Sequence, residues 1–216
     1  MVQLAFHFDS SACTGCKACQ VACKDKNDLP VGVSWRRVIE YGGGDWRPEG
    51  GLLVPVGVFA YQVSLSCMHC AEPACLPVCP AAAIRKREDG VVLVDGSRCL
   101  GCHFCEWACP YGAPQFGPGA GAMSKCDFCA DLLALGQNPV CVDTCPTRAL
   151  HWGDLAQLQA AHGQLQAVEP LPGPEQTQPS FVLTAHRHGQ PPGQGTGRVV
   201  RLRPPGSRED GHDPRS

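Results

Sequence analysis

The alternation of apolar and polar residues along the chain predicts two pairs of β-strands. These strands are expected at residues 83–87 and 91–95, and at residues 33–41 and 52–65. Asp89-Gly90 lies between the first two strands, and this dipeptide favours the turn of a tight hairpin. Gly42-Gly43-Gly44 lies between the other two, where we expect it to form the second turn.

Helical spacing is confined to short stretches. Residues 127–135 carry apolar side chains at helical intervals, and residues 153–161 do so around Asp154, a residue favoured at a helix start. From Gly163 onward 17 of 54 residues are glycine or proline, which predicts an extended or partly disordered tail over residues 163–216. Such a tail is expected to contact partner subunits.

No stretch has the roughly 20 apolar residues that a membrane helix needs. The nearest candidate, residues 51–65, is too short and is interrupted by Pro55 and Gly57. Residues 1–10 lack a basic segment followed by an apolar run. We therefore expect this chain to have no membrane span and no signal peptide of its own.

The composition provides little material for an apolar core. Of the 216 residues only 6% are aromatic, whereas there are 25 glycines, 20 prolines and 16 cysteines. The formal net charge is −2 and the isoelectric point about 6.4, so the chain has no bulk basic surface for nucleic acid. Something other than carbon packing is expected to support the fold.

The cysteines form four groups of four, with none left over. The groups are Cys13, Cys16, Cys19 and Cys23; Cys67, Cys70, Cys75 and Cys79; Cys99, Cys102, Cys105 and Cys109; and Cys126, Cys129, Cys141 and Cys145. Groups one and three read C-x2-C-x2-C-x3-C, and groups two and four keep the outer spacings but widen the middle gap. Proline follows the last cysteine at Pro80, Pro110 and Pro146, whereas Lys24 follows Cys23.

This spacing is typical of [4Fe-4S] sites. Three thiolates on one tight loop can hold three irons of a cubane, and the fourth reaches a neighbouring cluster. Gly15 and Gly101 lie where the backbone would pass close to inorganic sulfide, which a β-carbon would obstruct. Eight disulfides or four zinc sites would also use all the cysteines. However, C-x2-C pairs are poor structural bridges and C-x2-C-x2-C-x3-C is not a zinc spacing, so the pattern favours iron–sulfur clusters.

The groups are of two kinds, which alternate along the chain. Residues 9–16 and 95–102 share the pattern D-x-S-x-C-x-G-C, and residues 75–83 and 141–149 share C-x3-C-P-x2-A. This repeat predicts an α+β fold of duplicated two-cluster ferredoxin-like modules over residues 1–162. A β-hairpin insertion is expected at about residues 24–66, and the extended tail follows the modules.

The cysteine framework is accompanied by several longer motifs. These are Tyr-Gly-Gly-Gly-Asp-Trp at 41–46, Lys-Arg-Glu-Asp-Gly at 86–90, Cys-Pro-Tyr-Gly-Ala-Pro-Gln at 109–115 and Lys-Cys-Asp at 125–127. Over about residues 6–171 the chain resembles the iron–sulfur electron-transfer subunits of molybdopterin oxidoreductases. Within that family it most resembles the B subunits of dimethyl sulfoxide reductases.

The resemblance implies which cysteines share a cluster, because every family ligand position is cysteine here. Cluster 1 would be held by Cys13, Cys16, Cys19 and Cys145; cluster 2 by Cys23, Cys126, Cys129 and Cys141; cluster 3 by Cys67, Cys70, Cys75 and Cys109; and cluster 4 by Cys79, Cys99, Cys102 and Cys105. Some relatives have tryptophan at the second position of group three and hold a three-iron cluster there. Since this chain has Cys102 at that position, four [4Fe-4S] clusters are expected.

The resemblance also implies a function, electron relay, and no catalytic residue in this chain. Electrons would pass from a quinol-oxidising membrane anchor subunit, through the clusters, to a molybdopterin catalytic subunit that reduces an S-oxide or N-oxide. The chain would lie peripherally at the cytoplasmic membrane, on the periplasmic face by co-export with a partner. Other hypotheses are the same relay in a thiosulfate, polysulfide or formate enzyme, a diffusing ferredoxin-like carrier, and a structural zinc module that assembles protein partners.

Residues beside the cysteines are expected to tune the clusters. Four cubanes with their thiolates would add roughly −8 to the charge of the chain, so flanking cations should raise their potentials. These cations are Lys17, Lys24, Arg98, Lys125 and Arg148. His69 and His103 lie inside groups that already have four thiols, so we expect loop residues or hydrogen-bond donors rather than ligands. Trp107 and Trp152 are expected to pack against the clusters.

Overall fold

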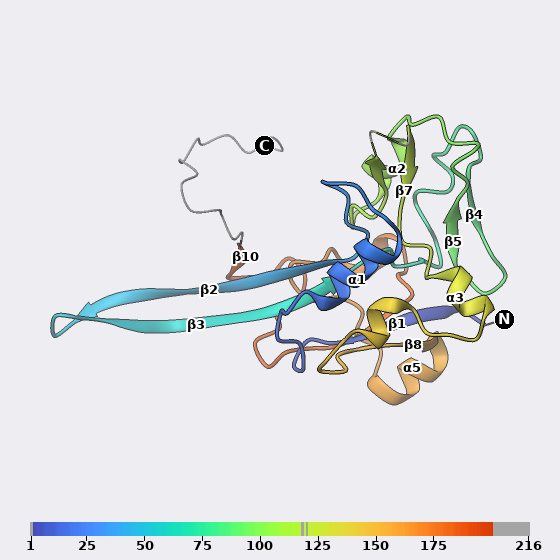
Figure 1. The fold of residues 1–216 in the computed structure, drawn as a ribbon. Helices are drawn as coiled ribbons and strands as arrows, with labels where there is room; N and C mark the ends of the chain where they lie inside the picture. The colour runs from blue at the N-terminus through green and yellow to red at the C-terminus, as the bar shows by residue number, and fades with distance from the viewer. Residues whose placement is uncertain (1, 118, 120, 201–216) are drawn as a thin grey trace.

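The computed structural model describes residues 2–117, 119 and 121–200, and a small three-stranded sheet lies in its body (Figure 1). The order of this sheet is β8 (Leu150–Asp154), β1 (Leu4–Asp9) and β9 (Phe181–Thr184), with β1 antiparallel to β8 and parallel to β9. Helix α5 (Leu155–His162) packs against this sheet. The Asp154 carboxylate accepts hydrogen bonds of 3.0 and 3.3 Å from the first turn, which confirms Asp154 at the helix start.

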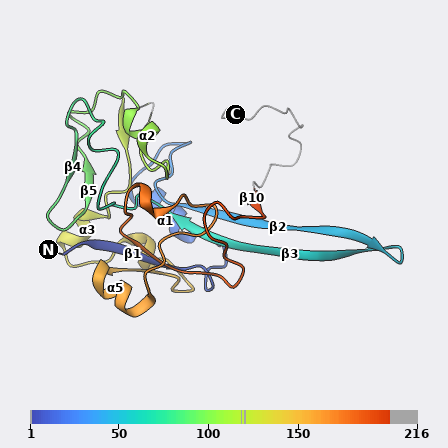
Figure 2. The same ribbon diagram turned by 180° about the vertical axis from the view of Figure 1, so that it is seen from behind.

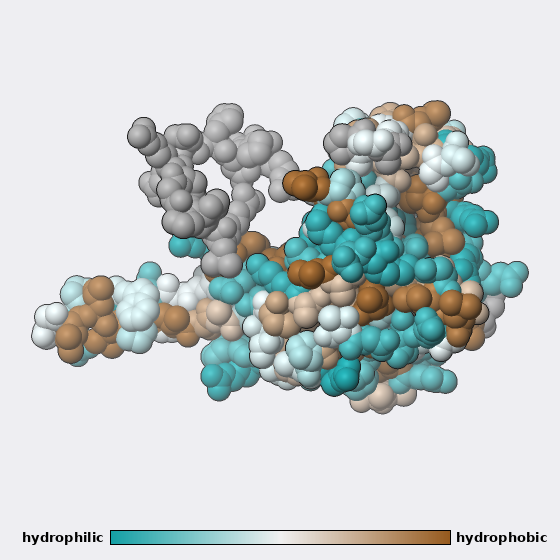
Figure 3. Space-filling model, viewed as in Figure 1, coloured by the Kyte–Doolittle hydropathy of each residue, from teal (hydrophilic) through white to brown (hydrophobic). Residues whose placement is uncertain are grey.

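A long two-stranded arm extends from the body (Figures 1 and 2). It consists of β2 (Arg37–Glu49) and β3 (Leu52–Leu65), paired antiparallel. The prediction of a strand at residues 52–65 is confirmed, and both strands lie within the expected insertion. Near the free end of the arm apolar side chains face solvent (Figure 3), among them Leu52 and Leu53, which are 72% and 68% exposed.

The predicted turn at Gly42-Gly43-Gly44 is wrong. These glycines lie within β2, where Gly42 pairs with Ala60 and the register shifts between Gly43 and Asp45. A Cβ on Gly44, whose φ is +102°, would lie 2.5 Å from the Val58 backbone, so this glycine run accommodates a bulge. The strands turn instead at Gly50-Gly51, which both have positive φ. The start of the first strand is also later than predicted, at Arg37.

Two short hairpins lie apart from the central sheet. The first pairs β4 (Ile84–Lys86) with β5 (Val92–Val94), and it confirms the hairpin predicted around Asp89-Gly90. The second pairs β6 (Gln115–Gly117) with β7 (Ala122–Ser124) and was not predicted.

The remaining helices are short and carry cysteines. They are α1 (Ala18–Lys26), α2 (Phe104–Ala108), α3 (Ala130–Ala134) and α4 (Val140–Asp143). The helix predicted at residues 127–135 is only partly present, because Phe128 and Cys129 have positive φ values of 63° and 50°. A right-handed helix can therefore begin only after Cys129.

Residues 163–200 belong to the segment predicted to be extended or partly disordered. After a 3₁₀ turn at Pro174–Gln176, strand β9 enters the central sheet beside β1, and β10 (Arg198–Val200) pairs with β2 of the arm. The segment is extended, as expected, but its strands pair with the rest of the fold. Residues 201–216 lie outside the described residues.

The core is made of aromatic side chains and cysteines together. Phe6, Phe8, Tyr61 and Phe128 pack in one cluster with cysteines from groups one, two and four. A second cluster combines Cys75 and Cys105 with apolar residues of the short hairpins. In the part of the chain that the structure describes, no helix is long and apolar enough to cross a membrane.

Candidate iron–sulfur cluster sites

All sixteen cysteines are free, so the hypothesis of structural disulfides is wrong. Ten of the sixteen are buried, Cys16 is exposed, and the other five are half-buried. Burial is unequal between the proposed clusters. Every ligand proposed for cluster 2 is buried, whereas three of the four proposed for cluster 4 are half-buried.

The four cysteine groups share one backbone feature. In each group the residue before the second cysteine has positive φ: Gly15 (71°), His69 (43°), Gly101 (64°) and Phe128 (63°). This conformation bends the C-x2-C segment into a tight loop. Glycine is present at two of the four positions because it adopts positive φ at no steric cost.

The last cysteine of three groups accepts a backbone hydrogen bond from the residue four positions later. The N–H groups of Ala83, Ala113 and Ala149 donate to the sulfurs of Cys79, Cys109 and Cys145 at 3.3, 3.5 and 3.3 Å. In each case proline follows the cysteine, and at Cys109 and Cys145 it lies just after the short helices α2 and α4, which it prevents from continuing. N–H donors of this kind stabilise a negatively charged sulfur.

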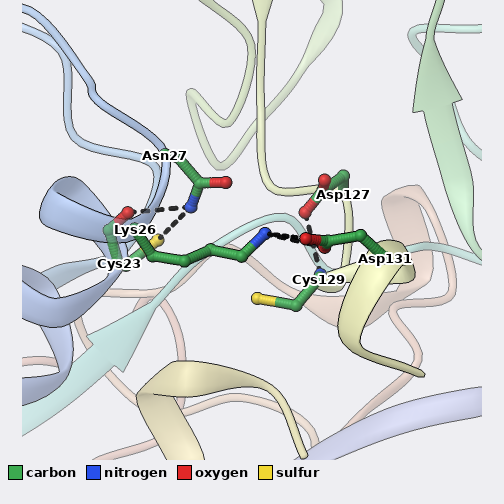
Figure 4. A network of polar contacts seen from close by, with 6 residues as sticks. All are labelled: Cys23, Lys26, Asn27, Asp127, Cys129 and Asp131. Atoms are coloured by element: carbon green, nitrogen blue, oxygen red, sulfur yellow. Dashed lines mark hydrogen bonds and ion pairs between the residues drawn. The ribbon is translucent and has the colours of Figure 1, made fainter. Parts of the chain in front are cut away.

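In group one, a side chain rather than a backbone N–H donates to the sulfur of the last cysteine. Since Lys24 replaces the proline, helix α1 continues past Cys23 to Lys26. The side-chain amide of Asn27, four residues after Cys23, donates to the Cys23 sulfur at 3.8 Å and to its carbonyl oxygen at 2.8 Å (Figure 4). Beside it, Lys26 forms an ion pair of 2.7 Å with Asp131 of α3, which joins the helices on either side of the proposed cluster 2 (Figure 4).

The thiols proposed for cluster 3 converge. Cys67, Cys70, Cys75 and Cys109 line one cavity, together with Lys125. Burial, together with the nearby sulfurs of Cys67, Cys109 and Cys70, raises the pKa of Cys75 to about 12. Lys125, which is 3% exposed, opposes this shift and donates hydrogen bonds to the carbonyl oxygens of Val92 and Cys126.

The other three proposed sets also show mutual electrostatic interactions. Burial raises the pKa of Cys13, and the sulfurs of Cys19, Cys145 and Cys16 add to that shift. For Cys105, burial and the sulfurs of Cys99, Cys102 and Cys79 raise the pKa to about 11. For Cys23, burial raises the pKa and the sulfur of Cys141 adds to that shift, and for Cys129 burial and Cys141 raise the pKa to about 11. In all four sets, thiols from distant parts of the sequence lie near one another.

Cys145 differs from the other buried thiols. Burial acts to raise its pKa, but hydrogen bonds from the Thr147 hydroxyl and from backbone N–H groups, including that of Ala149, lower it below its usual value. This environment favours a thiolate. The thiols whose pKa burial raises, such as Cys75 and Cys129, need a cation to become thiolates, and iron would supply that charge in a cluster.

The predicted cations occupy different environments. Lys125 is buried and faces Cys75, whereas Lys24 donates to the backbone oxygens of Pro30 and Val33. Arg98 and Arg148 are exposed and donate to the carbonyl oxygens of Ala81 and Asp143 respectively. Lys17 is exposed at the start of α1.

The histidines inside the cysteine groups serve the local fold. His69 is 1% exposed, and its Nδ1 accepts a hydrogen bond of 3.0 Å from the Val92 N–H. Burial, with Lys125 and Arg36 nearby, lowers its pKa well below the usual value, so the ring is neutral and Nε2 carries the proton. His103 pairs with Glu106 at 2.7 Å.

One of the two tryptophan predictions is wrong. Trp107 is 74% exposed, because it follows the buried Cys105 by two positions in α2 and so points away from it. Trp152 packs against the main core and donates from Nε1 to Asn138 at 2.9 Å.

Sequence reasoning missed Arg36. Its side chain is 1% exposed and interacts electrostatically with the thiols of Cys141, Cys126, Cys19 and Cys23. No local signal marks it, since it is far from the cysteines in sequence and only the fold brings it there.

The donor set fits [4Fe-4S] clusters. Soft thiols in four sets, N–H donors aimed at their sulfurs and buried positive charges are what such clusters need. Among residues 2–117, 119 and 121–200, no group of three or more histidine, cysteine or acidic side chains is arranged to hold a single metal ion.

Comparisons with known proteins agree with this chemistry. Residues 58–155 match the family of 4Fe-4S dicluster domains. The sequence is 50% identical to the B subunit of anaerobic dimethyl sulfoxide reductase from Escherichia coli (strain K12), over 92% of this sequence and 96% of that protein. It is 44% identical to the corresponding subunit from Haemophilus influenzae, over 91% and 96% respectively.

A more distant relative has a related role. The thiosulfate reductase electron transfer subunit of Salmonella typhi is 42% identical, over 72% of this sequence and 79% of that protein. The likeness to the dimethyl sulfoxide reductase B subunits is higher and spans nearly the whole sequence. The protein therefore belongs to the family of anaerobic dimethyl sulfoxide reductase B subunits, and it is an iron–sulfur electron-transfer subunit of a reductase complex.

Proposed function

We propose that this chain holds four [4Fe-4S] clusters in the four ligand sets given above, clusters 1 to 4. The observation that carries the proposal is the pairing of thiols across the sequence: Cys145 lies near Cys13, Cys23 near Cys141, Cys109 near Cys75, and Cys79 near Cys105. In each set the last cysteine of one group thus joins three cysteines of another.

The four clusters form a relay in the order 1, 2, 3, 4. The sulfurs of Cys19 and Cys141 interact, as do those of Cys126 and Cys67, which supports an arrangement with set 1 beside set 2 and set 2 beside set 3. Sets 3 and 4 are joined by the short segments between Cys75 and Cys79 and between Cys105 and Cys109. The inner sets are the more buried, and the exposed or half-buried thiols of sets 1 and 4 lie at the two ends.

The relay contains two ferredoxin-like modules that arose by duplication. The two D-x-S-x-C-x-G-C repeats form the same turn: the Ser11 N–H and hydroxyl donate to Asp9 at 2.8 and 2.6 Å, and those of Ser97 donate to Asp95 at 3.0 and 2.6 Å. We assign the modules to residues 1–162, with the insertion at about 24–66. Residues 163–216 form the segment that contacts partner subunits, and within it residues 163–200 contribute the strands described above.

Each bound cluster stores one electron at a time, and the chain's own residues set how readily it does so. Cysteine sulfurs hold the iron, backbone N–H groups donate to those sulfurs, and the core excludes water around the inner sets. Rigid loops with the same positive-φ residue keep the ligands in place when the charge changes.

The complex reduces an S-oxide or N-oxide, with electrons supplied by quinol. A molybdopterin subunit carries the reaction, an integral membrane subunit oxidises quinol, and this chain lies peripherally at the cytoplasmic membrane on the periplasmic face. The identity to dimethyl sulfoxide reductase B subunits favours this substrate class over thiosulfate, although the relay itself would serve either.

Iron and acid-labile sulfide analysis of the anaerobically purified complex tests the clusters. We expect about sixteen of each per chain, and four overlapping EPR signals after reduction. Cys16→Ser and Cys102→Ser are matched variants that should alter cluster 1 and cluster 4 respectively, with the other signals unchanged. Four zinc ions and no EPR signal would overturn the proposal.

The substrate and the partners need a second experiment. Affinity purification of the tagged chain should recover a molybdenum-containing subunit and an integral membrane subunit. The complex should oxidise a quinol analogue with dimethyl sulfoxide or trimethylamine N-oxide as acceptor. Turnover with thiosulfate or polysulfide alone would assign the relay to the alternative enzymes, and recovery of the chain without either partner would indicate a diffusing carrier.

A further inference from the structure

Arg36 is a buried positive charge without a carboxylate partner. Its side chain is 1% exposed, and none of the ion pairs among the described residues includes it. Its Nη1 donates to the Ser64 hydroxyl at 3.1 Å, and its guanidinium carbon lies 4.6 Å from the centre of the Phe6 ring. Its Nη2 is buried with no hydrogen-bond partner in the described part of the chain. A charge in this state is costly unless anions compensate it.

The negative charges that compensate Arg36 are those of cysteine sulfurs. Burial acts to lower its pKa, but the sulfurs of four cysteines raise it above its usual value, in the order Cys141, Cys126, Cys19 and Cys23. Three of these are proposed ligands of cluster 2 and Cys19 is a proposed ligand of cluster 1. The Ser64 hydroxyl that accepts from Arg36 also lies 3.6 Å from the Cys19 sulfur, so the contact reaches both sets.

We propose that Arg36 is the counter-charge shared by clusters 1 and 2. Lying between two clusters that each carry about −2, the guanidinium stabilises the extra electron on either one and weakens the repulsion between them. Arg36 is a positioning residue that raises both potentials, so that electrons pass between clusters 1 and 2 without a steep energetic step. Cluster 3 has a separate buried cation, Lys125, beside Cys75.

Arginine suits this place better than lysine would. Its planar group stacks over Phe6 and spreads one charge over several donors, which can face two sets of sulfurs at once. The aromatic contact and the Ser64 hydrogen bond hold the side chain in one orientation. Phe6 is itself stacked on Phe128, the residue before Cys129, at 4.1 Å between ring centres. The guanidinium is therefore fixed relative to the loops of both sets.

The role of Arg36 rests on the proposed ligand sets, but it is tested by cluster potentials, whereas the ligand sets are tested by iron and sulfide analysis. Arg36→Met removes the charge at similar volume, Arg36→Lys keeps it, and Arg98→Gln is the control at an exposed arginine. Each variant is purified as the whole complex, its iron is counted, and its cluster potentials are measured by EPR-monitored titration. We expect Arg36→Met to lower the potentials of clusters 1 and 2 and leave 3 and 4 unchanged, with Arg36→Lys close to wild type.

If the Arg36→Met complex keeps its iron and the potentials of clusters 1 and 2 are unchanged, the proposed role of Arg36 is overturned. If the wild-type complex contains no iron, the proposed function is overturned instead. If the Arg36→Met variant loses clusters, the wild-type complex labelled with ¹⁵N-arginine provides the test of whether the guanidinium lies beside clusters 1 and 2. Pulsed EPR of the reduced complex should then show coupling of guanidinium nitrogen to clusters 1 and 2. Absence of that coupling would contradict the inference.

Discussion

The side-chain amide of Asn27 donates to the sulfur of Cys23, with 3.8 Å between Nδ2 and Sγ. In the other three cysteine groups a backbone N–H four residues after the last cysteine makes this contact. A helix that continues past Cys23 has no free N–H at that position, because each N–H donates to a carbonyl of the preceding turn. A side chain thus replaces a backbone donor at the one group that lacks the proline.

Asn27→Ala should lower the potential of cluster 2 and leave the other three unchanged. The variant removes a donor that stabilises the more negative, reduced state of the cluster. It also removes the hydrogen bond to the Cys23 carbonyl, and we expect a loss of about 1 kcal/mol in the free energy of unfolding. EPR-monitored titration of the complex measures the first effect. Asn138→Ala is the control, since the side chain of this exposed asparagine forms hydrogen bonds with Asp143 and Trp152 and, among the described residues, with no sulfur. An equal shift in that variant would refute the role of Asn27.

Gly44→Ala should disrupt the arm. The residue has a φ of +102°, and a Cβ there would lie 2.5 Å from the Val58 backbone, so both strain and a clash oppose the substitution. We expect a loss of more than about 1 kcal/mol in stability and faster proteolysis within residues 37–65. Gly96→Ala is the matched control, since a Cβ at Gly96 meets nothing within 4 Å. Equal cleavage of the arm in both variants would mean that the bulge tolerates a side chain.

The pH dependence of stability should depend on His7. This side chain is 2% exposed, its Nε2 and the Thr184 hydroxyl share a hydrogen bond of 2.9 Å, and its ring stacks on His162 at 3.7 Å. Burial, followed by the neighbouring His162 and His151, lowers its pKa from 6.5 to about 4. Between these values the unfolded protein binds a proton at His7 that the folded protein does not, so stability falls as the pH drops through that window.

Denaturant unfolding of wild type and His7→Phe at pH 7.5 and 5.5 measures this effect. The variant should lose less stability than wild type between the two pH values, because phenylalanine cannot titrate. His188→Phe, at an exposed histidine, should keep the wild-type dependence. If His7→Phe and wild type respond equally, other groups account for the acid sensitivity.

The sequence predicted what depends on local spacing and missed what depends on the fold. The cysteine groups, the Asp89-Gly90 turn and the strand at 52–65 follow from residues close together in the chain, and the structure contains all of them. The Gly42-Gly43-Gly44 run looked like a turn because glycine permits turns and bulges alike, and only the opposite strand decides between them. Phe128 and Cys129 shortened a predicted helix because their left-handed conformation serves the cysteine loop.

The candidate site shows the same division. Spacing alone located all the cysteines, but Arg36 reaches the thiols of two groups only through the tertiary fold, and no pattern around it signals that position. The glycine- and proline-rich composition after Gly163 suggested an extended or partly disordered tail, yet Phe181–Thr184 is a largely buried run that completes the central sheet. A few apolar residues with a suitable edge strand outweighed the average composition of the segment.

Removal of iron should unfold the chain rather than only abolish electron transfer. The main core joins Phe6, Phe8 and Tyr61 to cysteines from three of the groups, and the second core contains Cys75 and Cys105. Without metal these thiols leave a core with few aromatic side chains, and they no longer connect loops that are distant in sequence. We expect chelation under anaerobic conditions to cause loss of the far-UV circular dichroism signal and uniform susceptibility to proteases, in parallel with loss of iron.

The decisive measurement is whether iron and folded structure are lost together, because a fold maintained by apolar packing alone would lose iron first and structure later. Reconstitution with ferrous iron and sulfide should restore both signals together. Zinc at the same thiol stoichiometry is the control and should not restore the native protease pattern, since one zinc ion cannot span four thiols spaced for a cubane. A protease-resistant, iron-free protein would show that the apolar clusters alone maintain the fold.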